Sequence, residues 1–160
     1  MALQHELGHK HPFASKEHEA LLSVYFTANR IKRRATDFFR AHELTDVQFN
    51  VLSLLKHESG EQGGLTQVEL SCMLLVNRAN ITSIVDRMEN AGLIRRTPTA
   101  QDRRYNLVSL TSRGRELLEA TEKDYLAAVH AVMSVLKEEE LDSLIAMLNR
   151  VRARLVKTKV

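Results

Sequence analysis

Breaks in regular structure are rare in this chain of 160 residues, which contains only two prolines and six glycines. Proline and glycine are the residues that most often end helices and strands, so their scarcity favours long regular elements. Aromatic residues make up 5% of the chain and there is no tryptophan. Leucine, valine, alanine and isoleucine must therefore fill the core, which favours helices packed on helices.

Capping residues and apolar periodicity predict four helices in the first 92 residues. The expected N-caps are Ser15, Thr45, Thr66 and Asn77. Thr45 and Thr66 are each followed three residues later by Gln or Glu, which is the spacing of a capping box. The first helix is expected to run to about His42, and Gly92 is suited to end the fourth.

Two short strands and two more helices are predicted after this point. Residues 93–96 and 105–110 alternate apolar and polar side chains, as half-buried strands do. Thr111 caps a helix that is expected to reach about residue 136, and a last helix is predicted over 138–156. Leu141, Leu144, Ile145, Leu148, Val151 and Leu155 form an apolar stripe along this last helix.

The third and fourth predicted helices are separated by a turn of only two or three residues, as in a helix-turn-helix. The fourth carries Ile81, Ile84, Val85 and Met88 on one face, which is expected to be buried. Its other side carries Asn77, Arg78, Asn80, Thr82, Ser83 and Arg87. These polar side chains are short enough to approach base edges and phosphates in a major groove. A solvated amphipathic helix has the same pattern, so the helix pair alone does not decide the function.

Positive charge is concentrated on the two predicted strands. The charged residues here are Arg95, Arg96, Asp102, Arg103 and Arg104, and their surplus equals the formal net charge of the whole chain, +3. An arginine at a narrow loop tip fits a minor groove, where the potential of DNA is most negative. Asp102 is placed to orient Arg104 by a charge-assisted hydrogen bond. A weak surface salt bridge is the simpler alternative.

Residues 65–114 resemble the MarR family of winged-helix transcription regulators. The resemblance rests on the helix pair, the "ENAGLIRR" that follows it, the "DRR" of the loop and the "LTSRG" of the return. Family wings often carry Asp-Pro before the tip, whereas this chain has Thr99-Ala100. The expected fold class is mainly α with a small β-wing: a winged helix-turn-helix that forms a homodimer through its N- and C-terminal helices.

This resemblance implies specific roles in DNA binding. Residues 77–87 would lie in the major groove, and Arg104 would enter the minor groove with Asp102 orienting it. Thr66 and Gln67, at the start of the preceding helix, would contact phosphate through the helix N-terminus. The remaining phosphate or wing-flank residues are Arg95, Arg96 and Arg103.

The family layout fits residues 15–157 as a single domain, after a flexible His-rich tail over 1–14. Within it, 45–110 would be the winged helix-turn-helix, and 15–42 and 111–157 the dimerisation helices. The stripe on the last helix needs a cover, which a second copy supplies; packing on the first helix of the same chain is the alternative. Two copies would engage a pseudo-palindromic operator in double-stranded DNA.

Relatives release DNA when a small, often aromatic or phenolic, compound binds between the dimer helices and the DNA-reading region. The resemblance therefore implies a repressor with a small-molecule effector. Tyr25, Phe26 and Phe49 are candidates for lining that pocket, and they are equally suited to an ordinary core.

Cys72 is the only cysteine, which excludes an internal disulfide and fits a cytoplasmic protein. We expect a buried thiol that packs as a small hydrophobic group. A redox-sensing regulator is the alternative, and it requires an exposed Cys72 with a lowered pKa. His5, His9 and His11 lie in the tail and make a poorly preorganised metal site, so neither a metal nor a cofactor is expected.

The sequence contains no nucleophile elbow, no phosphate-cradling glycine loop and no H-E-x-x-H. We therefore expect a DNA-binding transcription regulator and not an enzyme. A winged-helix protein-interaction module that does not bind DNA is the alternative from another class. Such a module predicts an apolar helix face and a wing without a basic tip, and this sequence has neither.

Overall fold

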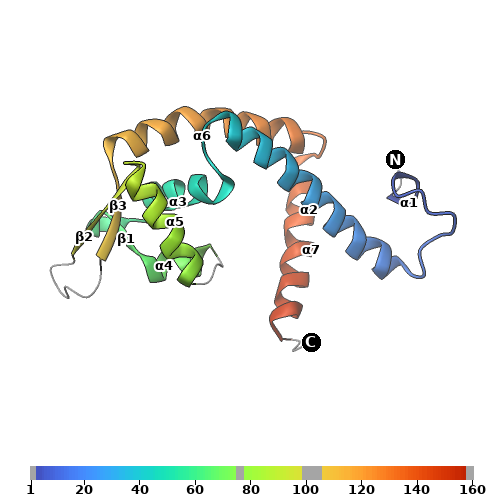
Figure 1. Ribbon diagram of the computed structural model, residues 1–160. Coiled ribbons are helices and arrows are strands. Elements are labelled where there is room, and N and C mark those ends of the chain that lie inside the picture. Colours follow the sequence, from blue (N-terminus) through green and yellow to red (C-terminus); the bar gives the residue numbers. More distant parts are fainter. Residues whose placement is uncertain (1–2, 75–77, 99–105, 158–160) are drawn as a thin grey trace. The chain divides into compact units, whose positions relative to one another are not determined.

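The structure is a computed structural model that describes residues 3–74, 78–98 and 106–157 (Figure 1). The side chains of Arg78 and Lys157 also lie outside the described part. The chain divides into two compact units, Met1–Leu118 and Glu119–Val160. Each unit is described by itself below.

The first unit contains nine helical or strand segments before the two long C-terminal helices. In chain order these are α1 (Leu3–Glu6), α2 (Lys16–Ala41), α3 (Asp46–His57), a 3-10 turn (Gly60–Gln62), β1 (Leu65–Thr66), α4 (Gln67–Met73), α5 (Arg78–Asn90), β2 (Ile94–Pro98) and β3 (Asn106–Leu110). Helix α6 (Ser112–Met133) begins in the first unit and ends in the second, which also holds α7 (Glu138–Lys157). The predicted mainly helical fold with a small sheet is confirmed, with α1 and β1 as additions.

The predicted caps at Ser15, Thr45 and Thr66 form as expected, while the predicted cap Asn77 lies outside the described residues. The Thr45 hydroxyl accepts a hydrogen bond from the main-chain N–H of Gln48, and the Thr66 hydroxyl accepts one from Glu69, both at 3.2 Å. In return, Gln48 Oε1 accepts from the Thr45 N–H at 2.9 Å and Glu69 Oε2 from the Thr66 N–H at 2.7 Å. Ser15 caps α2 with a single bond, in which its hydroxyl accepts from the main-chain N–H of His18. Because each cap satisfies an otherwise unpaired N–H, these residues fix where the helices begin.

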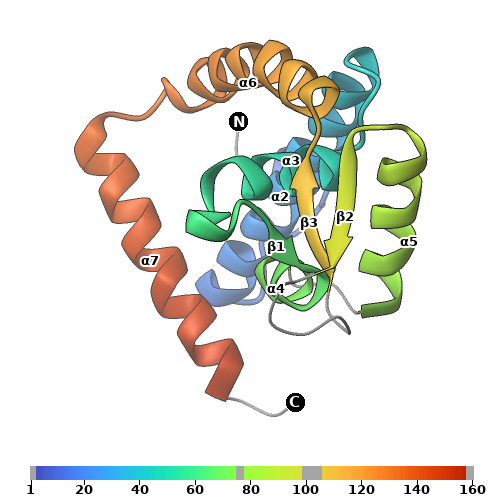
Figure 2. The same cartoon turned by 90° about the vertical axis from the view of Figure 1, so that its left-hand side faces the viewer.

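The three strands form an antiparallel sheet in the order β1-β3-β2, so β3 lies in the middle (Figure 2). Leu65 of β1 pairs with Val108 of β3, and Ile94 of β2 pairs with Leu110. Strand β1 consists of two residues directly before a capped helix, which is too short to give a periodic signal in the sequence. Figure 2 shows α5 alongside β2, so the recognition-helix candidate and the wing strand are neighbours.

The core of the first unit lies between α3, α5 and the sheet. Its fully buried side chains include Val51, Leu52, Ile81, Val85, Met88, Ile94 and Val108. The predicted inner face of α5 is therefore buried at three of its four positions, while Ile84 is half-buried. Burial of this face leaves the opposite face of α5 to solvent.

The "LTSRG" return packs tightly against the end of the α5–β2 turn. The Thr111 hydroxyl donates to the carbonyl oxygen of Gly92 at 2.7 Å and accepts from the Gly114 N–H at 3.0 Å. A Cβ atom at Gly114 would lie 2.0 Å from the Leu93 carbonyl oxygen, a distance at which atoms cannot coexist. The glycine is therefore required by this close approach of α6 to residue 93.

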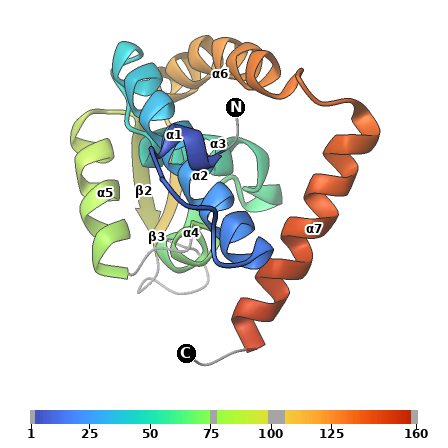
Figure 3. The same ribbon diagram turned by 90° about the vertical axis from the view of Figure 1, so that its right-hand side faces the viewer.

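Residues 3–13 hold more structure than the expected loose tail. Glu6 of α1 forms an ion pair with Arg30 of α2 at 2.6 Å. The course of the chain from α1 to the start of α2 is seen in Figure 3. The rings of His9 and Phe13 lie 5.3 Å apart, and those of Phe13 and His18 lie 5.9 Å apart. These contacts attach the start of the chain to the first long helix.

In the second unit, α7 begins with the three acidic residues 138–140, where the positive end of the helix dipole favours negative charge. The Lys137 N–H donates to Glu140 Oε2 at 2.8 Å and so starts the helix. Large apolar side chains remain exposed along α7, namely Ile145, Met147, Val151, Leu155 and Val156. Among the described residues, no helix combines the length and the apolar character that a membrane crossing needs.

Cys72 is exposed, so the prediction of a buried thiol is wrong. Leu70, two residues earlier on α4, is fully buried. Positions two apart on a helix differ by about 200° in direction. With Leu70 turned inward, Cys72 must face outward.

Candidate nucleic-acid interface

The outer face of α5 carries the polar side chains that the sequence predicted for it. Asn80, Thr82, Ser83 and Arg87 are all exposed. Asn77 lies outside the described residues, as does the side chain of Arg78. The helix that presents this face is held from behind by its buried Ile81, Val85 and Met88 side chains.

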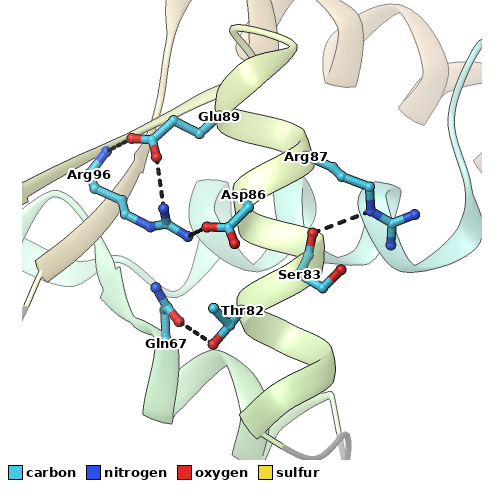
Figure 4. Close-up of polar contacts among 7 residues, drawn as sticks. All are labelled: Gln67, Thr82, Ser83, Asp86, Arg87, Glu89 and Arg96. Atoms are coloured by element: carbon cyan, nitrogen blue, oxygen red, sulfur yellow. Dashed lines mark hydrogen bonds and ion pairs between the residues drawn. The ribbon is translucent and has the colours of Figure 1, made fainter.

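A side-chain hydrogen bond connects the two helices of the helix-turn-helix (Figure 4). Thr82 Oγ1 of α5 donates to Gln67 Oε1 at the start of α4, at 3.0 Å. The Thr66 hydroxyl is used in its own capping box, because it also donates to Glu69 Oε2 at 2.8 Å. The two predicted phosphate contacts on α4 therefore both have a role inside the protein.

Arg87 lies farther along α5, beside the start of α3. Its Nε donates to the Ser83 carbonyl oxygen at 3.2 Å, which holds the side chain along the helix (Figure 4). Arg87 also borders a hollow of about 270 Å³. The lining residues are Thr45, Asp46, Val47, Gln48, Ile84 and Arg87.

The three residues predicted for a ligand pocket do not line this hollow. Tyr25 is 62% exposed, and its ring makes an edge contact with Phe26 at 5.9 Å. Phe49 is buried and packs against Phe39 with ring centres 4.8 Å apart. Phe49 is thus a core residue, which is the alternative that the sequence left open.

Arg95 and Arg96 are neighbours on β2 and point to opposite sides of the sheet, as strand geometry requires. Arg95 is exposed, and its Nε donates to Ser109 Oγ on β3 at 3.2 Å. Arg96 turns toward α5 instead (Figure 4). Only Arg95 of this pair is therefore placed on the solvent side.

Arg96 is bound by two carboxylates of α5. Its Nη2 lies 2.5 Å from Asp86 Oδ1 and its Nη1 lies 2.9 Å from Glu89 Oε2. Glu89 Oε1 also accepts the main-chain N–H of Arg96 at 2.9 Å. The side chain of Arg96 is 20% exposed. The sequence predicted Arg96 as a phosphate or wing-flank residue, and in the structure its guanidinium lies against α5.

The remaining predicted wing residues are Asp102, Arg103 and Arg104, and they lie outside the described residues. The clamp of Asp102 on Arg104 therefore stays a prediction.

Sequence reasoning missed two features of the charge distribution. Asp86 and Glu89 were not assigned any role. Their spacing of three residues on a helix, with Arg96 after the following tight turn, is a usable signal for an ion pair between helix and strand. The charge argument also overlooked α2, where residues 30–34 include four basic side chains. Of these, Arg30 is paired with Glu6. The positive surplus is thus not confined to the wing.

The described residues contain no group of three or more His, Cys, Asp or Glu side chains arranged to hold a metal ion. Away from the candidate interface, the pKa of Glu17 is lowered by a hydrogen bond with its own main-chain N–H and by one with the Ser15 side chain.

Comparison with known proteins identifies the family. The model of the MarR family matches residues 44–105. The HTH-type transcriptional regulator PecS of Dickeya dadantii is 30% identical over 129 residues, which is 81% of this chain and 77% of PecS. The chain belongs to the MarR family.

Solved structures of MarR family proteins share its fold. AbsC, a MarR family transcriptional regulator from Streptomyces coelicolor, matches with a TM-score of 0.80 at 21% identity, over 92% of this chain and 100% of AbsC. The complex of MepR from S. aureus with DNA matches with a TM-score of 0.73 at 25% identity, over 84% of this chain and 96% of MepR. The MarR family consists of transcription regulators.

Proposed function

We propose that the protein is a sequence-specific DNA-binding transcription regulator that acts as a homodimer. The observation that carries the proposal is the exposed polar face of α5. Asn80, Thr82 and Ser83 turn outward, opposite an inner face that is buried at Ile81, Val85 and Met88. Such a helix can enter a major groove without exposing apolar side chains to DNA. The similarity to MepR, which has been solved bound to DNA, supports this reading.

The proposed contacts fall into two groups. The side chains of α5, together with Asn77 and Arg78 at its start, read base edges and nearby phosphates. The arginines of the wing, Arg95, Arg103 and Arg104, contact the backbone and the minor groove, with Asp102 orienting Arg104. Thr66 and Gln67 act on phosphate through the N-terminus of α4, and Gln67 also orients Thr82.

A second copy provides the dimer and covers the exposed apolar side chains of the long helices. On α7 these include Val151 and Leu155, and on α2 they include Leu21 and Ile31. Exposed apolar side chains in such number along two helices are typical of an association surface. A two-fold dimer presents two copies of α5 to a pseudo-palindromic operator.

The regulator is proposed to be a cytoplasmic repressor that leaves DNA when a small effector binds. Such a compound must bind the DNA-free conformation more tightly than the DNA-bound one, since otherwise it shifts no equilibrium. The hollow beside Arg87 and the surroundings of Tyr25 and Phe26 are the places to look for it. Catalysis is not part of this proposal.

The test is titration of a labelled duplex that carries the region upstream of the protein's own gene, at several salt concentrations. A shuffled duplex of the same length is the control. We expect tighter binding to the upstream duplex, and an affinity that falls linearly on a log–log plot against salt, because neutralised phosphates release counterions. Absence of binding, equal binding to the shuffled duplex or binding that ignores salt would each contradict the proposal.

A further inference from the structure

Arg96 joins the recognition-helix candidate α5 to the wing strand β2 by three hydrogen bonds. Two are made by its guanidinium, to Asp86 at 2.5 Å and to Glu89 at 2.9 Å, and the third by its main-chain N–H, to Glu89 at 2.9 Å. Figure 4 shows both carboxylates pointing from α5 toward Arg96. The contact therefore fixes both the backbone and the side chain of β2 at this position.

The two acids hold Arg96 from positions one turn apart. Residues three apart on a helix lie on the same face, so the carboxylates of Asp86 and Glu89 both face β2. A planar guanidinium that binds both of them fixes its own orientation, because its N–H groups form a rigid fork. A single ion pair would leave the plane of the guanidinium undefined, whereas two carboxylates fix both its position and its orientation on α5.

Arg96 is poorly placed to contact DNA. Its side chain is 20% exposed, against 51% for Asp86 and 35% for Glu89. Its Nε is buried and has no hydrogen-bond partner among the residues that the structure describes. Reaching a phosphate would require breaking both charge-assisted bonds, which are among the stronger polar contacts in proteins.

We propose that Arg96 is a positioning residue that holds the wing at a fixed angle to α5, so that the two DNA-reading elements act as one rigid piece. This inference rests on the proposed function. Its energetic basis is preorganisation: elements already fixed in the binding geometry lose less conformational freedom when DNA is bound. Arg95, its neighbour on the outer side, is the contrasting case of a residue available to phosphate.

The first measurement needs no DNA. Hydrogen–deuterium exchange of the β2 amides is compared in the wild type, Arg96→Met, Glu89→Gln and the control Arg95→Met. We expect faster exchange of β2 in the first two variants, with α3 unchanged, and wild-type exchange in Arg95→Met. Wild-type exchange of β2 in Arg96→Met would overturn the inference, whatever the protein does with DNA.

The second measurement separates positioning from phosphate contact by salt dependence. Arg96→Met is expected to bind the operator about tenfold more weakly. The slope of its log affinity against log salt concentration is expected to stay unchanged. Arg95→Met is expected to lower the slope by about 0.9, the value for one lost phosphate contact. A slope that falls equally in both variants, or an unchanged affinity in Arg96→Met, would overturn the inference. If the wild type binds no DNA, the proposed function fails and the exchange experiment still decides whether the connection exists.

Neutral variants of Asp86 and Glu89 are expected to change DNA affinity in opposite directions, depending on whether Arg96 contacts phosphate or positions the wing. If Arg96 contacted phosphate, Asp86→Asn and Glu89→Gln would free it and strengthen binding. If it positions the wing, both variants weaken binding even though each removes a negative charge. Glu61→Gln, an exposed site in the same unit, is the control for charge removal alone. Should Arg96→Met fail to fold, Arg96→Lys is used, because a lysine keeps the charge but cannot bridge two carboxylates in a fixed plane.

Discussion

The Thr82 hydroxyl donates a hydrogen bond to the side-chain oxygen of Gln67 at 3.0 Å, and this bond joins two helices across 15 residues of sequence. A double-mutant cycle with Thr82→Val and Gln67→Ala measures the coupling. We expect a coupling of about 1 kcal/mol in the free energy of urea unfolding, the usual net value of a side-chain hydrogen bond. Additive effects of the two changes would mean that the bond contributes nothing. Ser83→Ala, next to Thr82 on the exposed face, is the control.

The capping box at the start of α4 predicts a specific cost. Thr66→Ala removes the acceptor for the Glu69 N–H and is expected to lower the free energy of unfolding by about 1 kcal/mol. Thr66→Ser keeps the hydroxyl and is expected to retain most of the stability. Chemical denaturation followed by circular dichroism measures both variants, and equal losses in the two would show that the methyl group matters and the cap does not.

Gly114→Ala is expected to destabilise the first unit by more than about 2 kcal/mol. The added Cβ would lie 2.0 Å from the Leu93 carbonyl oxygen, so α6 or the α5–β2 turn must shift, and overpacking of this kind is costly. The neighbouring change Arg113→Ala, at an exposed position of the same helix turn, is the control and is expected to be close to neutral. Thermal unfolding of the two variants provides the measurement. A neutral Gly114→Ala would show that the two segments do not approach so closely.

The exposed Cys72 is expected to react with a thiol reagent in the native protein. Labelling with a maleimide, followed by mass spectrometry, should add one group per chain at a rate close to that of the denatured protein. Labelling only after unfolding would show that the thiol is buried, as the sequence analysis predicted. Cys72→Ser is the blank for this reaction.

The proposed dimer predicts that a charge on α7 separates the two copies. Val151→Glu places a carboxylate on an exposed apolar position and is expected to yield monomers in sedimentation equilibrium at concentrations where the wild type is dimeric. Asn149→Glu adds the same charge at an exposed polar position and serves as the control. Dimers in both variants, or monomers in the wild type, would contradict an association through α7.

Local signals in the sequence predicted most of the fold, because helix caps and apolar periodicity act over a few residues. The caps at Thr45 and Thr66 and the buried face of α5 followed directly from such signals. The role of Arg96 did not, because Asp86 and Glu89 reach it only when β2 folds back along α5. A sum of charges along the sequence cannot show which of them neutralise one another.

The exposure of Cys72 was misjudged for a related reason. Cysteines are commonly buried, and the prediction rested on that tendency. It did not use the position of Cys72 two residues after Leu70 on α4, which turns the thiol outward. The periodicity already used for α5 would have placed the thiol on the outer side. Short elements such as β1 remain beyond this kind of reasoning, since two residues carry no period.

The sheet order β1-β3-β2 leaves β1 and β2 at the two edges, and both edges are protected. Strand edges with free N–H and C=O groups recruit further strands and so lead to aggregation. Here β1 offers only two residues, while β2 ends at Pro98, which has no N–H, and has its Arg96 N–H occupied by Glu89. Growth of the sheet by strand addition is therefore blocked at both sides, and the protein can carry long exposed helices for association without also assembling into fibrils through its wing.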